Sequence, residues 1–210
     1  AWSFDEGTGT VAADGSGNGN DGEIVDATWV SGQLGSALAF DGAGYVDIPA
    51  AACASIDTQL TIAFWTYIDF LGDQWPFTFG AFTEPSNNEA RAFSGHLPWA
   101  NGILYFDTGG PGFDRIEKPV PESDYADMWV HWAFVKDADT GVQMIYRNGV
   151  LWHSAAGKTL PLGGAEVGEM QAITSIYRVD MENSDFIEMQ PCEAREIKLK
   201  EKRIEEWVAT

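Results

Sequence analysis

The sequence predicts an all-β protein, a two-sheet antiparallel β-sandwich of the jelly-roll kind with a short C-terminal helical turn. Gly and Pro occur 23 and 9 times, and with Asn-Gly and Asp-Gly pairs they interrupt the chain about every ten residues. The segments between these interruptions alternate in side-chain polarity with the period of a β-strand. A helical pattern is confined to residues 202–208.

Two segments predict central strands. In residues 60–68, Leu60, Ile62 and Phe64 lie on one face while Ala63 and Trp65 lie on the other. Residues 128–135 show the same two-sided apolar pattern. Because both faces of each strand are apolar, we expect both strands to be covered on both sides.

A hairpin is predicted further along the chain. Residues 142–147 and 150–153 flank Asn148-Gly149. Asn and Gly tolerate the positive φ that both central positions of a type I′ turn require. The two segments are therefore expected to pair as antiparallel neighbours.

The remaining strands are expected at residues 24–30, 36–40, 45–48, 77–82, 103–107, 171–178 and 193–199. The composition shows no linker-like break and no internal repeat. We therefore expect one domain over residues 1–210.

The charge of the chain excludes several partners. It has 12 Lys and Arg against 32 Asp and Glu, a formal net charge of −20, which repels nucleic acid and anionic lipid. No apolar run approaches the roughly 20 residues of a membrane span, so membrane insertion is not expected. Residues 1–90 contain no Lys or Arg, so either the two ends of the chain meet or metal cations balance part of this charge. Self-repulsion favours a monomeric module.

The two cysteines leave two alternatives open. Cys53 and Cys192 are far apart and form no C-x-x-C motif, so zinc and thioredoxin-type chemistry are not indicated. Either they form a disulfide in an oxidising compartment, or they are two free, buried thiols.

Several motifs carry a family resemblance. They lie at residues 1–7, 14–22, 35–42, 45–49, 60–67, 129–135 and 145–150. In this order they resemble the bacterial laminin-G-like, concanavalin A-like lectin domain. Residues 97–107, Leu-Pro-Trp-Ala-Asn-Gly-Ile-Leu-Tyr-Phe-Asp, are similar to a segment in a subset of these domains from secreted bacterial proteins. The resemblance implies an extracellular module, secreted or at the cell surface, of a larger protein.

A structural calcium ion is expected near the N-terminus. The glycine-rich loop 14–21 offers oxygen ligands at Asp14, Asn18 and Asp21, the ligand type that calcium prefers. The resemblance implies an acid from Asp5 or Glu6, together with Glu193, as further ligands of the same ion. The chain has Pro191-Cys192-Glu193 where the family commonly has Ile-Asp-Glu, so one expected carboxylate is missing. The alternative is a series of Asx turns without metal.

Two tryptophans are candidate carbohydrate platforms. Trp75 and Trp99 lie beside prolines in predicted loops, where an indole ring either stacks on a sugar or packs against the protein. Arg91, His96, Asp107 and Asp114 are the expected polar contacts. Asn101, Arg115, Tyr177 and Arg178 lie around them, and arginines also suit acidic substituents unless they pair with neighbouring carboxylates.

Catalysis is not expected. The chain lacks a Glu-x-Asp-x-x-Glu run, a G-x-S-x-G elbow and an H-E-x-x-H pair. The sequence therefore favours a non-catalytic polysaccharide-binding module. The alternatives are a protein-binding or adhesion domain, and a glycoside hydrolase or polysaccharide lyase of the same fold.

Overall fold

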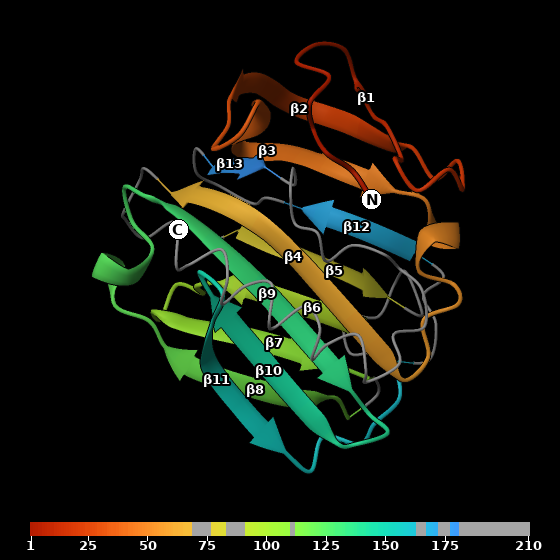
Figure 1. The fold of residues 1–210 in the computed structure, drawn as a ribbon, viewed down its shortest axis with the longest axis vertical. Coiled ribbons are helices and arrows are strands. Elements are labelled where there is room, and N and C mark those ends of the chain that lie inside the picture. Colours follow the sequence, from red (N-terminus) through yellow and green to blue (C-terminus); the bar gives the residue numbers. More distant parts are fainter. Residues whose placement is uncertain (69–76, 83–90, 110–111, 163–166, 172–176, 181–210) are drawn as a thin grey trace.

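The computed structural model describes residues 1–68, 77–82, 91–109, 112–162, 167–171 and 177–180, with the backbone alone at 41–43, 81, 82, 91, 167–171 and 177–180. The described elements, in chain order (Figure 1), are β1 (Val11–Ala12), β2 (Gly22–Ser31), β3 (Ser36–Ile48), the 3₁₀ helix η1 (Ala50–Ala52), β4 (Gln59–Ile68), β5 (Phe77–Phe82), β6 (Arg91–Leu97), β7 (Ile103–Thr108), β8 (Asp114–Pro119), the 3₁₀ helix η2 (Glu122–Asp124), β9 (Trp129–Asp137), β10 (Val142–Arg147), β11 (Val150–Ala156), β12 (Val167–Gln171) and β13 (Tyr177–Asp180).

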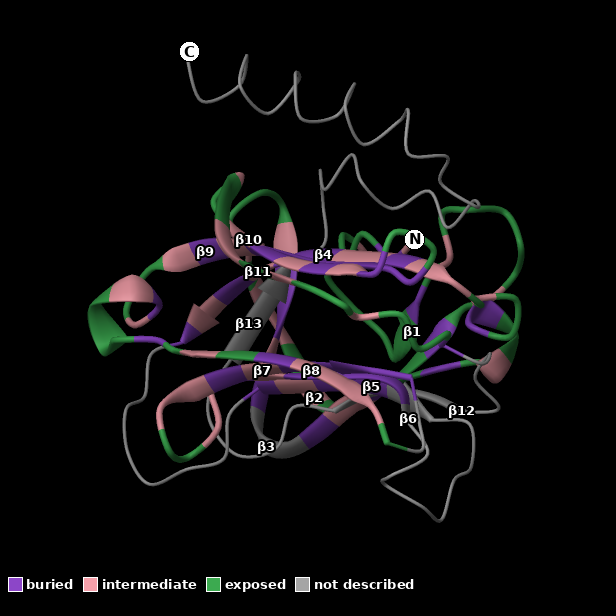
Figure 2. Ribbon diagram, turned by 90° about the horizontal axis from the view of Figure 1, so that it is seen from below, coloured by how far each residue is buried: buried purple, intermediate pink, exposed green. Residues whose placement is uncertain are grey.

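Two layers of antiparallel strands face one another across the core (Figure 2). One layer has the order β11-β10-β9-β4-β13, and the other has the order β12-β5-β6-β7-β8. β3 pairs with β13 through its first half and with β12 through its second half, and β2 runs along its other side. The long strand β3 therefore connects the layers along one edge, and the predicted antiparallel β-sandwich is confirmed.

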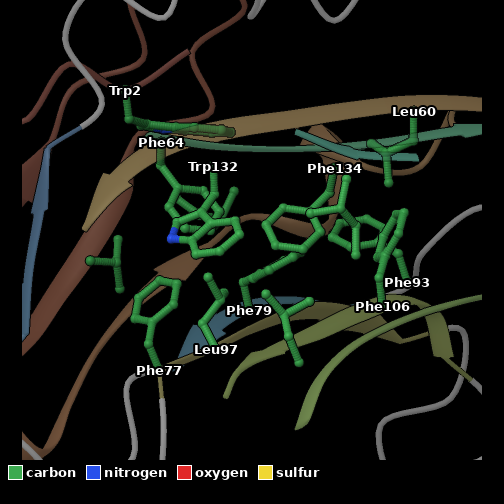
Figure 3. Packing of buried hydrophobic residues seen from close by; sticks show 14 of the residues in the cluster. Trp2, Leu60, Phe64, Phe77, Phe79, Phe93, Leu97, Phe106, Trp132 and Phe134 are labelled. Atoms are coloured by element: carbon green, nitrogen blue, oxygen red, sulfur yellow. The ribbon is translucent and has the colours of Figure 1, made fainter. Parts of the chain in front are cut away.

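Aromatic rings from both layers fill the space between them (Figure 3). Phe134 on β9 lies 4.8 Å from Phe79 on β5 and 5.3 Å from Phe106 on β7, measured between ring centroids. Phe64 on β4 lies 5.2 Å from Phe77 on β5. Tilted and edge-to-face contacts at these distances add favourable energy to the burial of apolar area. The two layers are thus held together mainly by phenylalanine contacts.

The central strands and the hairpin are confirmed. β4 and β9 pair along nearly their whole lengths. β10 and β11 pair around the two-residue turn, in which Asn148 and Gly149 have φ values of 49° and 76°. Both central residues therefore have the positive φ of a type I′ turn.

One of the predicted strand divisions is wrong, and another prediction is tested only at its ends. Residues 36–40 and 45–48 belong to the single strand β3, which continues through the point where its pairing partner changes. Of the segment 171–178, predicted as one strand, residue 171 ends β12 and residues 177–178 begin β13, while residues 172–176 lie outside the described part of the chain. The predicted strand 193–199 and the helical turn 202–208 lie outside the described residues.

The structure adds three strands that the alternation of polarity did not indicate, the two-residue β1 and the longer β6 and β8. In β8, Asp114 and Lys118 point toward the other layer, where each binds a polar partner. In β6, Ser94 is buried although it lies on the face opposite to the core. Charged residues facing inward and small residues buried on the outer face both obscure the period of two.

Candidate functional site

The turn between β6 and β7 holds Trp99 in place. The main-chain N–H of Trp99 donates to the carbonyl oxygen of Ile103 at 2.9 Å, and that of Gly102 donates to the carbonyl oxygen of Trp99 at 2.8 Å. Gly102 has a φ of 74°, a conformation that glycine adopts at little cost. Asn101 closes the turn, because its Oδ1 accepts from the main-chain N–H of Ile103 at 3.0 Å. The indole ring, which is partly exposed, is therefore carried by a hydrogen-bonded turn.

Three aromatic side chains gather beside this turn. The ring of His96 on β6 lies 4.6 Å from that of Trp99 and 6.3 Å from that of Tyr105 on β7. The Nδ2 group of Asn101 donates to the Tyr105 hydroxyl at 2.8 Å. His96 and Tyr105 are directly paired in register, while their neighbours Leu97 and Phe106 face the core. The cluster therefore lies on the outer face of the sheet at its β6–β7 end. We call these four residues, Trp99, His96, Tyr105 and Asn101, the aromatic platform.

Arg115 on β8 borders the aromatic platform. Its guanidinium carbon lies 4.6 Å from the centre of the Tyr105 ring and 5.0 Å from that of Phe113. Its Nε and Nη2 groups donate to the two carboxylate oxygens of Asp107 at 2.6 and 2.7 Å. The hydrogen bonding of Arg115 to Asp107 raises the pKa of Arg115, with burial opposing the shift. Arg115 is therefore a permanent cation held rigidly by a buried carboxylate.

The structure brings some of the predicted contacts together and excludes others. His96 and Trp99 are adjacent, as the prediction requires. Asp107 is completely buried by its pairing with Arg115, which corrects the prediction that it contacts a ligand. Asp114 faces the other layer and accepts from Lys136, so it too belongs to the fold. The side chain of Arg91 and all of Trp75 lie outside what the structure describes.

Tyr105 and Glu117 are site residues that the sequence reasoning did not single out. They are directly opposite one another on β7 and β8, and Glu117 is exposed. Tyr105 could have been found from the alternation within residues 103–107, because it shares a strand face with the predicted contact Asp107. Glu117 carried no such signal because β8 was not predicted as a strand.

A second aromatic group lies on the outer face of the other layer. Trp65 on β4 lies 5.2 Å from His131 on β9, and Tyr67 lies 5.7 Å from Trp129. Burial lowers the pKa of His131 to about 4, so its imidazole is neutral at pH 7. All four side chains are partly exposed, and each packs on its cross-strand partner.

The predicted calcium loop is organised by hydrogen bonds at Asp14. Its Oδ1 accepts from the main-chain nitrogens of Ala1 and Ser16, each at 2.9 Å. Its Oδ2 accepts from the Ser16 hydroxyl at 2.7 Å and from the main-chain N–H of Asn20 at 3.0 Å. Burial opposes ionisation here, but these hydrogen bonds outweigh it and lower the pKa of Asp14 well below its usual range. Both oxygens of Asp14 are thus already used by the loop itself.

The other predicted metal ligands are only partly assembled. The Oε1 atom of Glu6 accepts from the main-chain N–H of Ala13 at 2.7 Å, whereas its Oε2 atom is buried and has no hydrogen-bond partner among the described residues. Asp5 accepts from the main-chain N–H of Ser36 at 3.2 Å, and the amide of Asn18 donates to Ser16. Glu193 lies outside the described residues. Within the described part of the chain, no three His, Cys, Asp or Glu side chains are grouped to hold a metal ion.

The structure describes one of the two cysteines, for which a disulfide and two free thiols were the alternatives. Cys53 is buried with a free thiol, and burial raises the pKa of that thiol to about 11. Cys192 lies outside the described residues. Such a thiol stays protonated at neutral pH and is a poor nucleophile.

Comparison with known proteins identifies the family. The family model of the concanavalin A-like lectin/glucanases superfamily, of the laminin G type, matches residues 40–168. The chain belongs to this family, and its antiparallel sandwich agrees with the assignment. A search of curated protein sequences found no match.

Several solved structures share the fold. Domain 4 of AbnA, a GH43 extracellular arabinanase from Geobacillus stearothermophilus solved with arabinotriose, is 19% identical with a TM-score of 0.59, over 85% of this chain and 89% of that one. The binding domain of Paraclostridial Mosquitocidal Protein 1 is 14% identical with a TM-score of 0.64, over 85% and 47%. The binding domain of Botulinum neurotoxin DC, solved with rat synaptotagmin II, is 14% identical with a TM-score of 0.61, over 97% and 50%.

At these sequence identities the similarities show a shared fold and nothing further. The chain spans about half the length of the two toxin domains. Among the described residues, no helix is long and apolar enough to cross a membrane.

Proposed function

We propose that this chain is a non-catalytic, extracellular polysaccharide-binding module of a larger bacterial protein and that the aromatic platform contacts the sugar. The observation that carries the proposal is the partly exposed Trp99 ring, fixed by its turn and adjoining His96 and Tyr105. Aromatic rings stack on the apolar faces of sugar rings, and the neighbouring Asn101 and Arg115 provide hydrogen-bonding groups for hydroxyls. The arabinotriose bound to the similar arabinanase domain is consistent with such a ligand.

The arrangement of carboxylates supports a binding role over a hydrolase. On the outer face of β6, β7 and β8, the described carboxylates are Asp107 and Glu117. A retaining glycosidase needs two carboxyl groups about 5.5 Å apart that both reach the substrate. Asp107 is fully buried and occupied by Arg115, so it is not available as a nucleophile or as a proton donor. A lone Glu117 does not make a catalytic pair.

The test is a polysaccharide array followed by variants of two tryptophans. We expect saturable binding to at least one polymer and an affinity at least tenfold lower in Trp99→Ala, the loss of about 1.5 kcal/mol expected for one aromatic contact. Trp129→Ala is the matched control, because Trp129 is also partly exposed but lies on the other layer. Equal losses in both variants, or no loss in Trp99→Ala, would remove the aromatic platform from the proposal.

Binding to protein is the second candidate. The similar toxin domain solved with rat synaptotagmin II is the observation that favours it. A module of this kind would bind no polymer on the array. Its partner would instead be sought among proteins of the surface to which the parent protein attaches.

We also propose that a structural calcium ion binds near the N-terminus through Glu6. The support is the buried Oε2 atom of Glu6, because a buried carboxylate oxygen normally has a donor or a cation beside it. Asp14 is a weaker candidate ligand, since a metal would have to displace its four hydrogen bonds.

A further inference from the structure

The charges around the aromatic platform indicate which polysaccharides it accepts. We propose that the ligand is a neutral polysaccharide and that polymers bearing sulfate or carboxylate groups are rejected. This inference rests on the proposed function and concerns the same site. It starts from Arg115, the cation nearest to the platform among the described side chains.

Arg115 is neutralised before any ligand arrives. Its two hydrogen bonds to Asp107 are short and bidentate, and Asp107 has no exposed surface. The pair therefore carries no net charge. An anionic substituent therefore meets a pair without net charge, and it cannot replace the bidentate contact without leaving Asp107 as an uncompensated buried charge. Arg115 is thus poorly suited to bind sulfate.

The guanidinium nevertheless keeps donors for uncharged oxygens. Of the five N–H groups of an arginine, two donate to Asp107, and the side chain is 37% exposed. Sugar hydroxyls can accept from the remaining N–H groups and donate to the exposed carboxylate of Glu117. A neutral polymer can therefore use both charged residues, whereas an anionic polymer is repelled by Glu117.

Lys118 and Lys136, two other described cations, face away from the platform. Lys118 faces the other layer, where its Nζ donates to the carbonyl oxygen of Trp152 at 2.9 Å. Lys136 points into the space between the layers and pairs with Asp114. The side chain of Arg91, at the start of β6, lies outside what the structure describes. Within the described part of this face, no unpaired cation lies beside the platform.

Further carboxylates add to the repulsion of anions. Glu23 on β2 and Asp47 on β3 are exposed, directly paired in register, and on the outer face of the sheet that continues to β8. The chain as a whole has a formal net charge of −20. Such a field lowers the local concentration of polyanions at low ionic strength.

The test compares neutral polymers with anionic derivatives of the same backbone. Affinity electrophoresis would use laminarin, agarose, linear arabinan and xylan, followed by the sulfated derivative of each polymer that binds. Measurements at pH 8 keep histidines of ordinary pKa neutral. We expect the sulfated derivative to bind at least tenfold more weakly than its parent. This difference in affinity should decrease as NaCl is raised from about 20 mM to about 300 mM, because salt screens the repulsion.

Two variants test whether the charge of Glu117 weakens the binding of sulfated polymers. Glu117→Gln changes an exposed side chain. At low salt it should reduce the ratio between the affinities for the neutral and the sulfated polymer by at least threefold. Glu23→Gln removes the same charge from the same face, but six strands from β8, about 29 Å along the sheet, so it should narrow the difference in affinity much less than Glu117→Gln does.

The outcomes separate the two proposals. If a sulfated or uronic polymer binds more tightly than every neutral polymer, and Trp99→Ala weakens that binding, the proposed function stands and the inference about charge is wrong. If no polymer of either kind binds, the proposed function itself fails.

Discussion

The ammonium nitrogen of Lys136 lies 2.8 Å from Oδ2 of Asp114, and this ion pair joins β9 to β8 across the interior of the sandwich. The Lys136 side chain has 0% exposure and also donates to the carbonyl oxygen of Lys158 at 2.6 Å. Asp114 in addition accepts from the main-chain N–H of Leu160 at 2.9 Å. One inward-facing pair therefore fixes both layers and the segment that follows β11.

Lys136→Met should destabilise the protein by about 3 kcal/mol, because it leaves Asp114 partly buried without its cation. Urea unfolding followed by tryptophan fluorescence measures the change. The matched control is Arg147→Met, which breaks a pair with Asp124 in which both side chains are 27% exposed. That change should cost no more than about 1 kcal/mol. Equal losses in the free energy of unfolding for the two substitutions would show that the interior pair stabilises the protein no more than the exposed pair does.

The stability of the protein should fall between pH 7 and pH 5 because of His131. Burial lowers the pKa of this residue to about 4, whereas a histidine in the unfolded chain titrates near 6.5. Below pH 6.5 the unfolded chain therefore binds a proton that the folded chain does not. The free energy of unfolding should decrease by about 2 kcal/mol over this range.

Replacement of the histidine checks this assignment. His131→Gln should remove most of the decrease, as measured by urea unfolding at pH 5, 6 and 7. His153→Gln on β11 serves as the comparison and should remove less of the decrease, because burial lowers the pKa of His153 while a hydrogen bond opposes the shift. If the free energy of unfolding still decreases between pH 7 and pH 5 in His131→Gln, other titratable groups cause the decrease.

Gly95→Ala should destabilise the fold by about 1 to 3 kcal/mol. An added Cβ at this position would overlap the ring of Phe79, which is itself packed against Phe64 and Phe134. Overpacking a filled core forces side chains and backbone to shift. For a chain of this size, thermal unfolding should begin several degrees lower.

The control for this substitution is Gly15→Ala. An added Cβ there would meet the carbonyl oxygen of Ala1 at 3.4 Å, an ordinary contact distance. The melting temperature should change little. A normal melting temperature for Gly95→Ala would mean that the Phe79 ring can move aside without cost.

Chelation tests the proposed calcium ion. EDTA should lower the melting temperature, and an excess of calcium should restore it, since an ion present at a hundred times its Kd stabilises the folded state by about 2.7 kcal/mol. Glu6→Gln should abolish the response, whereas Glu122→Gln, an exposed change in η2, should preserve it. A melting curve that EDTA does not alter in the wild-type protein would contradict the proposal.

Local patterns predicted a large part of the fold. The alternation in residues 60–68 and 128–135 predicted β4 and β9, and Asn148-Gly149 predicted the β10–β11 turn. These features were readable because strand period and turn conformation depend on residues that are neighbours in the sequence. The family motifs, likewise contiguous, predicted the sandwich that the structure shows.

The site depended more on contacts between distant residues. A loop tryptophan beside a proline singled out Trp99, and the same face of the sheet brought His96 beside it. The sequence could not show that Asp107 would form an ion pair with Arg115, or that Asp114 would form one with Lys136. Partner choice among charged side chains is decided by which strands become neighbours and which faces they share. The sequence alone therefore determined the strands, the turns and the family, while the tertiary structure decided which charges are neutralised inside the protein and which remain for a ligand.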